Sequence, residues 1–392
     1  AYVHSWDHTE QMLIEAFGTE YEKNGLVVNP DHIIGSGSAA QVYRGTLTLK
    51  EKSKNLYYGE PKNVTKDVAI KVLHPNIRLL VERDLLLMTR VAGLIDSLPF
   101  EIIKMLGLPR AASNFTSVMR EQVDLRLEGE NLDRFYDNFI SAATSNGAFP
   151  WRDPKTTFPR PYDGWVAHNV LVEEFIGDST PISEYLNDNS EDGKALRKEL
   201  AGPLLRAFLK MIFLDNFVHG DLHPGNVLVK KKTSTNGEHT VVFLDAGIAT
   251  SLSPKDQQNL IDLFRAVIFN DGDKAGRLMV ERARYERCSQ VEGGVDAFAA
   301  GIDSIVTEFH TRRKEGLTLG TVRIGTLLGR VLDLCRIHGV EIDPAMATVV
   351  ISTLVLEGLG RSLDPDLDLL YLALPFVVSW DNIRRLSQSQ FL

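Results

Sequence analysis

The sequence reads HGDLHPGNVLV at residues 219–229 and FLDAG at residues 243–247. An Asp followed five positions later by an Asn, a hydrophobic strand, a turn and a second strand ending in Asp-x-Gly is typical of a phosphotransferase site. In protein kinases the first Asp is the catalytic base, and the Asn and the second Asp hold Mg²⁺ on the nucleotide phosphates. The pattern therefore predicts Asp221 as the catalytic base and Asn226 with Asp245 as the metal ligands.

The segment between these residues supports the same interpretation. Phosphoryl transfer depends mostly on positioning and on neutralising charge, so its metal ligands must converge. Residues 227–229 and 241–244 read as two strands, and the connection between them ends in the turn dipeptide Asn236-Gly237. Such a hairpin would place Asn226 and Asp245 side by side. A chance HGD in a loop, followed by an unrelated turn, would not place two strands between them in this order.

Composition limits the class of protein. The chain has 392 residues, of which 44% are hydrophobic and 24% charged, as in a globular protein with one large or two moderate domains. The net charge of -9 argues against a nucleic-acid partner. Two cysteines, Cys288 and Cys335, argue against a disulfide framework and indicate a reducing or redox-neutral compartment. Because the chain begins with Ala1 and not Met, we expect a fragment or processed form with any targeting segment upstream.

A glycine-rich stretch near the N-terminus is the candidate nucleotide loop. Residues 33–45 read as strand, turn and strand, and small residues in the turn would let backbone N–H groups approach phosphate oxygens. Most such turns are only hairpins, but DVAIKV follows at residues 67–72 and matches the kinase strand whose lysine pairs with the α- and β-phosphates. A solvated edge lysine is the alternative. The cofactor-binding residues expected here are Gly35, Ser36, Gly37, Ser38, Ala39, Ala40 and Lys71.

A lysine in this role needs a carboxylate partner, and two glutamates qualify. Glu82 lies on the first helix expected after the lysine strand, where ordinary protein kinases keep this residue. Glu128 lies on a later helix and shares one face with Asp124 and Asn131. A row of polar residues of that kind is usually a solvated surface. The residues alone therefore leave both glutamates open as the partner of Lys71.

The rest of the pattern suggests two lobes. Residues 141–163 contain four prolines and are expected to form a loop, and residues 165–176 are expected to form one strand. Glu174 lies near the end of that strand, where a kinase hinge offers backbone groups to adenine, and a hinge is a natural lobe boundary. The sequence after the hinge is helical by pattern, with Ser253-Pro254 as one helix start.

Together these motifs resemble the UbiB family of atypical kinase-like proteins, also called the aarF-domain-containing or ADCK kinases. The resemblance covers nearly the whole chain. It rests on QVYR at residues 41–44, on the segment with Glu128 and Asn131, on residues 219–226 and on RSLDPD at residues 361–366. It implies a bilobed kinase-like fold, nucleotide and Mg²⁺ binding, and a role in ubiquinone or isoprenoid-lipid metabolism, often in mitochondria. The family's lysine-pairing glutamate falls on Glu128, which favours Glu128 over Glu82.

The chain departs from the family pattern at three places. The Lys-x-Gly-Gln motif upstream of the nucleotide loop is not in this chain, and the Ala-rich loop of some members contains Gly35 and Gly37 here. The family's Glu-x-Asp segment is Gln122-Val123-Asp124, which has one carboxylate fewer. These changes indicate a divergent branch and leave its nucleotide preference, ATP or ADP, open.

We therefore predict an α+β, bilobed protein-kinase-like fold, with a β-rich N-lobe carrying helical insertions over residues 1–176 and a mainly helical C-lobe over residues 177–392. The expected function is an ATP- and Mg²⁺-dependent atypical kinase or ATPase in ubiquinone or mitochondrial lipid metabolism. Its expected catalytic residues are Asp221, Lys71 and Glu128. A lipid or isoprenoid-quinone precursor, peripheral membrane contact and a mitochondrial location are expected from the resemblance. No nucleic-acid partner is expected, and the oligomeric state stays open.

Two observations argue against a protein substrate. Gly220 occupies the place of the kinase arginine that reads an activation-loop phosphate, and few residues separate Gly247 from the next helix. Two other functions remain as alternatives. One is a small-molecule kinase resembling aminoglycoside phosphotransferases, whose catalytic loop also reads His-Gly-Asp-x-His-x-x-Asn. The other is a nucleotide-binding pseudokinase scaffold without turnover.

Overall fold

The structure is a computed structural model of the 392-residue chain. It describes residues 3–51, 62–97, 108–141, 155–231, 239–283, 285–314, 324–341, 355, 357–367 and 369–377. The Asn236-Gly237 turn that the sequence predicts lies outside the described residues. Most of the proline-containing loop predicted over residues 141–163 also lies outside them.

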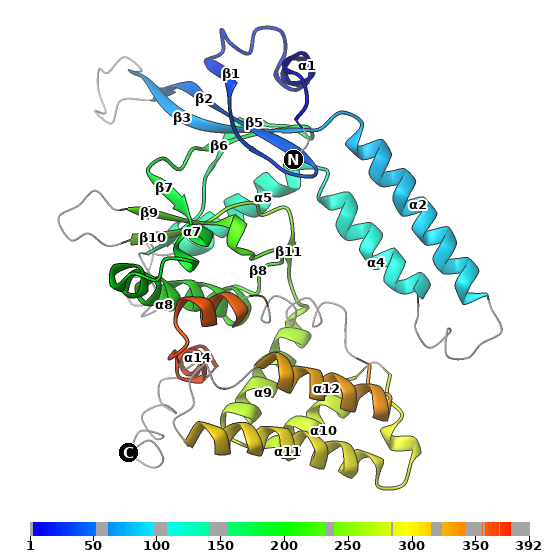
Figure 1. The fold of residues 1–392 in the computed structure, drawn as a ribbon. Helices are drawn as coiled ribbons and strands as arrows, with labels where there is room; N and C mark the ends of the chain where they lie inside the picture. The colour runs from blue at the N-terminus through cyan, green and yellow to red at the C-terminus, as the bar shows by residue number, and fades with distance from the viewer. Residues whose placement is uncertain are drawn as a thin grey trace, which may run out of the picture. The chain divides into compact units, whose positions relative to one another are not determined.

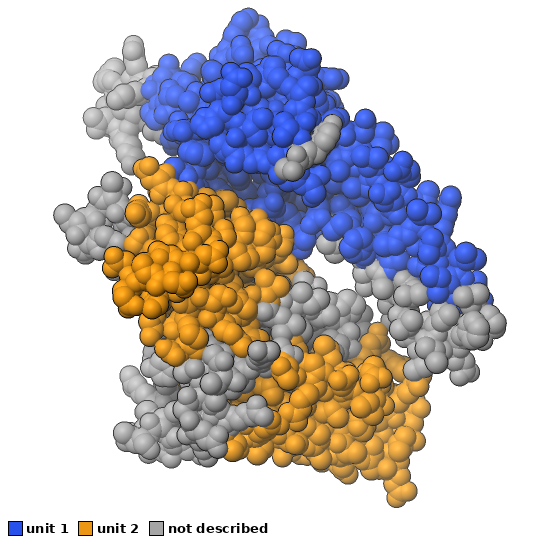
Figure 2. All heavy atoms as spheres, in the orientation of Figure 1, with its two compact units in different colours: residues 1–137, 158–177, 245–248 blue, residues 138–157, 178–244, 249–392 orange. Residues whose placement is uncertain are grey.

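The chain divides into two compact units (Figure 2). Unit 1 comprises Ala1–Asp137, Phe158–Gly177 and Asp245–Ile248, and unit 2 comprises Asn138–Thr157, Asp178–Leu244 and Ala249–Leu392. One division of the chain falls directly after Gly177, close to the segment predicted as a hinge. The short stretch that carries Asp245 belongs to unit 1, although it follows a strand of unit 2.

Unit 1 is built on a five-stranded antiparallel sheet with strand order β1-β2-β3-β6-β5 (Figure 1). Its strands are β1 (Leu26–Ser36), β2 (Ala40–Glu51), β3 (Lys62–Leu73), β5 (Pro161–Val166) and β6 (Val170–Glu174). The single strand predicted over residues 165–176 is wrong, because the chain reverses there. Ala167 N donates to Val170 O at 2.7 Å and closes a tight turn between β5 and β6.

One face of this sheet forms the core of unit 1. Side chains alternate between the two faces of a strand, so every second residue of β3 points the same way. Val68, Ile70 and Val72 are fully buried and pack with Tyr43 and Leu47 of β2. Helix α1 (Trp6–Phe17) covers this face and adds Leu13 to the cluster. The opposite face of β3 carries Ala69 and Lys71.

Three further helices of unit 1 lie within the described residues. They are α2 (Ile77–Asp96), α4 (Leu108–Glu121) and α5 (Leu125–Tyr136). Helices α2 and α4 pack along each other, and α5 packs on β5 and β6 (Figure 1). Asp124 caps α5, since its side chain accepts the backbone N–H of Arg126 at 3.1 Å. The helix that carries Glu128 is therefore held against the sheet.

Unit 2 contains a four-stranded sheet of order β4-β10-β9-β7 and a two-stranded sheet of β11 and β8. Its strands are β4 (Thr156–Thr157), β7 (Ser179–Pro181), β8 (Val218–His219), β9 (Val227–Lys231), β10 (His239–Phe243) and β11 (Ala249–Thr250). Strands β9 and β10 are antiparallel, with Val227 opposite Phe243. This pairing confirms the hairpin predicted after Asn226.

Helices make up most of the rest of unit 2. They are α7 (Ile182–Leu186), α8 (Glu191–Phe213), α9 (Pro254–Ile268), α10 (Gly272–Arg282), α11 (Gly294–Lys314), α12 (Ile324–His338) and α14 (Leu369–Val377), with short turns η2 (Pro224–Asn226) and η3 (Cys288–Gln290). A π-helical turn, η1 (Asp137–Ser141), follows α5. The predicted start of α9 is confirmed, because Ser253 caps it through the N–H of Asp256. Among the described helices, none is both long and apolar enough to cross a bilayer.

Candidate active site

Lys71 lies on β3 and faces away from the core of unit 1. Its Nζ donates to both carboxylate oxygens of Glu128, each at 2.8 Å, and lies 3.1 Å from Asp245 Oδ2. The side chains of Lys71 and Glu128 are 15% and 5% exposed. Burial alone would lower the pKa of Lys71, but the carboxylates of Glu128 and Asp245 raise it above its ordinary value. The ammonium is therefore charged and fixed in position.

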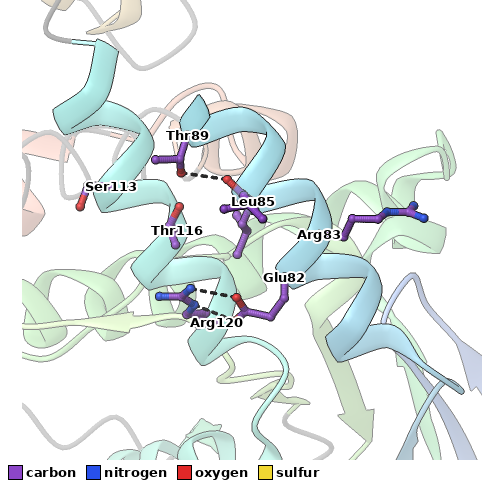
Figure 3. Close-up of a pocket in the computed structure, with 8 residues that line it drawn as sticks. Glu82, Arg83, Leu85, Thr89, Ser113, Thr116 and Arg120 are labelled. Carbon is purple, nitrogen blue, oxygen red and sulfur yellow. Dashed lines mark hydrogen bonds and ion pairs between the residues drawn. The ribbon is translucent and has the colours of Figure 1, made fainter. Parts of the chain in front are cut away.

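Glu82, the alternative partner, has a different role. It lies on α2 and accepts two hydrogen bonds from Arg120 of α4, from Nε at 2.7 Å and Nη2 at 2.8 Å (Figure 3). Both side chains are about half exposed. They line a groove of about 520 Å³ between the two helices. The family resemblance thus favoured the glutamate that the structure places on Lys71.

Helix α5 makes a second contact with the site, one turn after Glu128. Asn131 Nδ2 donates to the backbone oxygen of Ala246 at 2.8 Å, within the Asp245-Ala246-Gly247 turn. Polar rows of this kind are usually solvated surfaces, but Glu128 is buried. Asp124 does not join the site, because its carboxylate binds Arg126 at the start of the helix. Gly129 permits this close packing, since a Cβ there would lie 3.0 Å from Val166 Cγ1.

The predicted nucleotide loop is the turn between β1 and β2. Gly37 N donates to Ala40 O at 2.9 Å, which closes the turn around Ser38 and Ala39. His74, just after β3, makes two contacts with the loop. Its backbone N–H donates to Ala39 O, and its Nε2 lies 3.1 Å from Gly37 O. A Cβ at Gly35 would meet no atom within 4 Å, so the backbone is open on that side. Sequence reasoning missed His74, which no motif marked.

Within the Gln41-Val42-Tyr43 segment, Gln41 and Tyr43 belong to a buried polar network next to the loop. Gln41 Oε1 accepts the backbone N–H of His4, and Gln41 Nε2 donates to Tyr43 OH at 2.5 Å. His4 Nδ1 lies 2.7 Å from His74 Nδ1, and its other ring nitrogen contacts Thr9. Burial, with His8 and His74 nearby, lowers the pKa of His4 to about 4, so its ring is neutral. These residues are bound to one another beneath the loop.

Glu174, the residue expected at a hinge, ends β6. Its backbone N–H donates to Arg160 O at 2.9 Å, and the next N–H, of Phe175, donates to Asp67 O. The contact between this segment and adenine stays a prediction. Glu173, the preceding residue, was not selected from the sequence. It lies opposite Ala69 in the register of β3 and β6, on the sheet face that carries Lys71.

The predicted catalytic loop belongs to unit 2 and is held by His219. This histidine is fully buried, its Nε2 lies 3.0 Å from Leu244 O, and its Nδ1 accepts the backbone N–H of Asp221 at 3.2 Å. The first residue of the HGD motif thus ties the loop to the end of β10. Asp221 is half exposed, and His223 Nε2 lies 3.7 Å from its Oδ2.

Asn226 is fixed by the same loop. Its backbone oxygen accepts the N–H of Leu244 at 2.8 Å, directly before Asp245 in the chain. Its side-chain Nδ2 donates to Asp221 O at 3.1 Å, which orients the oxygen end of the amide away from that carbonyl. Asp245 is 47% exposed and adopts a positive φ of 50°, and its Oδ1 accepts the N–H of Gly247. Carboxylate and amide oxygens are ligands that suit Mg²⁺, which takes its other ligands from water and phosphates.

The chain is similar to known proteins over most of its length. Residues 3–279 match the ABC1 atypical kinase-like domain, and residues 312–368 match the UbiB helical domain. A mitochondrial ABC1 family protein of Saccharomyces cerevisiae is 34% identical over 420 residues, which cover 95% of this chain and 60% of that protein. A protein of Histophilus somni named probable protein kinase UbiB is 27% identical over 374 residues, covering 95% of this chain and 61% of its own. The chain thus spans about three fifths of the length of these relatives.

A solved structure has the same fold. It is the complex of Rv3197 from Mycobacterium tuberculosis with erythromycin, with a TM-score of 0.56 and 16% identity, and the match covers 94% of this chain and 82% of that one. At this identity the likeness concerns the fold alone, and it agrees with the α+β kinase-like fold predicted from the sequence. Because the ABC1 domain matches well over half of the residues, the chain belongs to the ABC1/UbiB family of atypical kinase-like proteins.

Proposed function

We propose that the protein is an ATP- and Mg²⁺-dependent atypical kinase or ATPase that acts on water or a small acceptor. The observation that carries this proposal is the ion pair of Lys71 with Glu128 and Asp245 on one face of the unit 1 sheet. Kinases bind nucleotide phosphates with a similar arrangement. In them a lysine is paired with a glutamate and lies near a metal-binding aspartate. The backbone at Gly35, on β1 and separated from β3 by β2, is open and favours contacts with phosphate groups.

Asp221 would orient the acceptor or take its proton. Its backbone N–H is fixed by His219, and its carboxylate is half exposed and therefore accessible to a small molecule. A base placed in this way lowers the barrier by accepting the proton of the attacking hydroxyl or water. His219 would act only by positioning Asp221, because its ring nitrogens contact the Leu244 carbonyl and the Asp221 backbone N–H.

Asn226 and Asp245 fit a divalent metal by their chemistry. Each would supply an oxygen ligand, and Mg²⁺ in phosphotransferases needs only one or two protein ligands besides phosphate oxygens and water. When bound, the metal supplies charge neutralisation on the phosphates. The chain's own contribution is to hold Asp245, through Asn131 on the adjacent Ala246 oxygen and through Lys71.

Several features favour a small acceptor over a protein. The segment after Gly247 is short, since β11 pairs with β8 and α9 begins at Pro254. A peptide platform of the kinase type has no room in such a connection.

Relatives named as mitochondrial ABC1 proteins support a mitochondrial location, and the family resemblance supports a lipid or isoprenoid-quinone precursor as the acceptor. Membrane contact, where it occurs, would be peripheral.

A binding titration with a matched control tests the proposal. The purified chain is titrated with ATP, with and without Mg²⁺, and compared with Lys71→Met and Lys50→Met, where Lys50 is an exposed lysine on the neighbouring strand. A lost charge-assisted contact weakens binding by about tenfold or more. We expect this loss for Lys71→Met and none for Lys50→Met. Equal affinity in the wild type and Lys71→Met, or binding that ignores Mg²⁺, would overturn the proposal.

Phosphate release identifies the acceptor class. It is followed with water alone, with vesicles, and with a soluble isoprenoid-quinone headgroup. Stimulation by the headgroup, transfer of the phosphate onto it, or steady release to water each supports the proposed activity. Efficient labelling of a general protein substrate under the same conditions contradicts it.

A further inference from the structure

His223 is a half-exposed histidine two residues after Asp221 in the predicted catalytic loop. It precedes η2, and its Nδ1 accepts the backbone N–H of Gly225 at 3.0 Å. Because an N–H group can only donate, Nδ1 must be the unprotonated nitrogen, and the neutral ring then carries its proton on Nε2. The local fold thus fixes which ring nitrogen of His223 is the donor.

Gly225 keeps the ring in this position. A Cβ atom at residue 225 would lie 2.7 Å from His223 Cε1 and 2.9 Å from its Nδ1, closer than real contacts of this kind. Any other residue would therefore push the ring away from the backbone N–H that it accepts. The backbone of His223 is fixed as well, because its oxygen accepts the N–H of Asn226 at 2.9 Å. The short His-Pro-Gly-Asn sequence thus holds an imidazole ring at a defined place beside Asp221.

The Nε2 atom of this ring lies next to the carboxylate of Asp221. It is 3.7 Å from Asp221 Oδ2, and Asn226 Nδ2 donates to the same oxygen at 3.4 Å. Two N–H groups thus lie beside one carboxylate oxygen. The 3.7 Å distance is longer than a hydrogen bond, but hydrogen bonds between catalytic groups are often long before the substrate binds and tighten in the complex.

Such contacts matter because a free carboxylate group rotates. The terminal torsion of an aspartate has a broad, two-fold profile, so an unsupported base points in the right direction only part of the time. Proton transfer requires the base within hydrogen-bond reach of the proton and correctly oriented. Holding one oxygen of Asp221 also fixes the direction of the other oxygen.

We propose that His223 is a positioning residue that, together with Asn226, holds Oδ2 of Asp221 and so makes Oδ1 the atom that receives the proton of the acceptor. The inference rests on the proposed function, in which Asp221 is the base, and names a residue that orients it. In the transfer the acceptor oxygen bonds to the γ-phosphorus, its proton moves to Oδ1, and the bond from that phosphorus to the leaving oxygen of ADP breaks. The proton then leaves Oδ1 for solvent, since Asp221 is half exposed.

Two substitutions separate this role from that of capping η2. In His223→Asn the amide oxygen lies at the δ position, like Nδ1, so the variant keeps an acceptor for the N–H of Gly225 but no longer reaches Asp221. In His223→Gln the amide nitrogen lies at the ε position, like Nε2, so the variant keeps a donor for Asp221 but has no acceptor at the δ position. A capping role predicts that Asn is the better replacement, and the positioning role predicts that Gln is.

The test measures ATP affinity, and phosphate release at saturating MgATP, for the wild type and both variants. Displacing a catalytic group by about 1 Å can cost about 10²-fold in rate. We therefore expect His223→Asn to release phosphate about 10- to 100-fold more slowly at unchanged ATP affinity, and His223→Gln to recover most of this loss.

His168→Asn is the matched control. His168 is a partly exposed histidine of unit 1, and its Nε2 lies 3.8 Å from Glu15, a ring–carboxylate contact of the same kind away from Asp221. Its phosphate release should equal that of the wild type. If His223→Asn fails to fold in a urea titration, His223→Gln alone decides, because slow release at unchanged ATP affinity in that variant contradicts the positioning role.

The outcomes separate the two proposals. If the wild type is active and Asp221→Asn is not, but His223→Asn works at the wild-type rate or His223→Gln is no faster than His223→Asn, only the role of His223 is overturned. If the wild type neither releases nor transfers phosphate, or if Asp221→Asn keeps full activity, the proposed function of Asp221 is overturned and the role of His223 with it.

Discussion

Removing Glu128 should destabilise unit 1, because it leaves Asp245 as the remaining ion-pair partner of the buried Lys71 ammonium among the described residues. Two unit charges 2.8 Å apart attract by about 6 kcal/mol at an effective dielectric constant of about 20. Desolvation offsets part of this, and removing one partner of a buried pair costs about 3–5 kcal/mol. Asp245 lies 3.1 Å from Lys71 and compensates in part. We therefore expect Glu128→Leu to cost about 3 kcal/mol, at the lower end of that range.

The complementary variants complete a double-mutant cycle. Lys71→Met removes the one cation that binds Glu128 in the described structure and leaves its carboxylate beside Asp245, so it should cost more than Glu128→Leu. The double variant removes both charges and should recover most of the loss, since an apolar pair of similar volume replaces a buried ion pair at little net cost. A large coupling energy is the signature of a buried pair.

Urea unfolding provides the assay. Trp6 and Trp165 pack against the core of unit 1, so their fluorescence reports on this unit. The measurement is made near neutral pH with a chelator and without nucleotide. The control is the Glu82→Leu and Arg120→Leu cycle, because that pair has the same two-bond geometry at half-exposed positions. The reasoning is refuted if the Lys71–Glu128 coupling is no larger than the control coupling.

Three further predictions concern the site. Asp245→Asn should lose Mg²⁺-dependent nucleotide binding in a titration while keeping its circular dichroism spectrum, and unchanged affinity would count against Asp245 as a ligand. Asp221→Asn should bind ATP normally but release phosphate about 10²–10⁴ times more slowly, and full activity would exclude Asp221 as the base. Burial first, and then the charge of Glu128, raise the folded pKa of Glu173 to about 8 from its ordinary value of 4.5, so its stabilising effect is complete below about pH 4.5 and is lost as the pH rises to about 8. The urea midpoint should fall less steeply with rising pH in Glu173→Gln than in the wild type. Equal slopes in the two proteins would show that Glu173 does not titrate as stated.

Local patterns in the sequence were sufficient to predict much of the fold. The alternation around Lys71 marks a strand with one polar face, and the spacing from Asp221 to Asp245 marks a loop and a hairpin. Both depend on residues close together in the chain. The hairpin of β5 and β6 was missed because its turn, at residues 167–169, contains neither Gly nor Pro. The turn is instead closed by the hydrogen bond from Ala167 to Val170.

The parts of the site that could not be predicted depend on which elements pack together. Glu173 and Glu174 are equivalent in sequence, and only the pairing of β6 with β3 places the first on the face of Lys71. The row of polar residues on α5 looks like a solvated surface until the helix is packed on the sheet. His74 carries no motif, yet it supports the nucleotide loop through two hydrogen bonds.

Helix α5 explains how this chain can lack the phenylalanine of the kinase Asp-Phe-Gly turn. In kinases the packing of that ring helps to set the active and inactive states. Here the residue is Ala246, whose side chain is fully buried and whose backbone oxygen is bound by Asn131. Glu128 lies one turn earlier on the same helix and binds Lys71. One face of α5 thus binds both the lysine and the turn that carries Asp245. These two parts of the site are therefore coupled through the backbone of α5. Because Ala246 has no ring, a ring flip of the kinase type cannot occur at this turn.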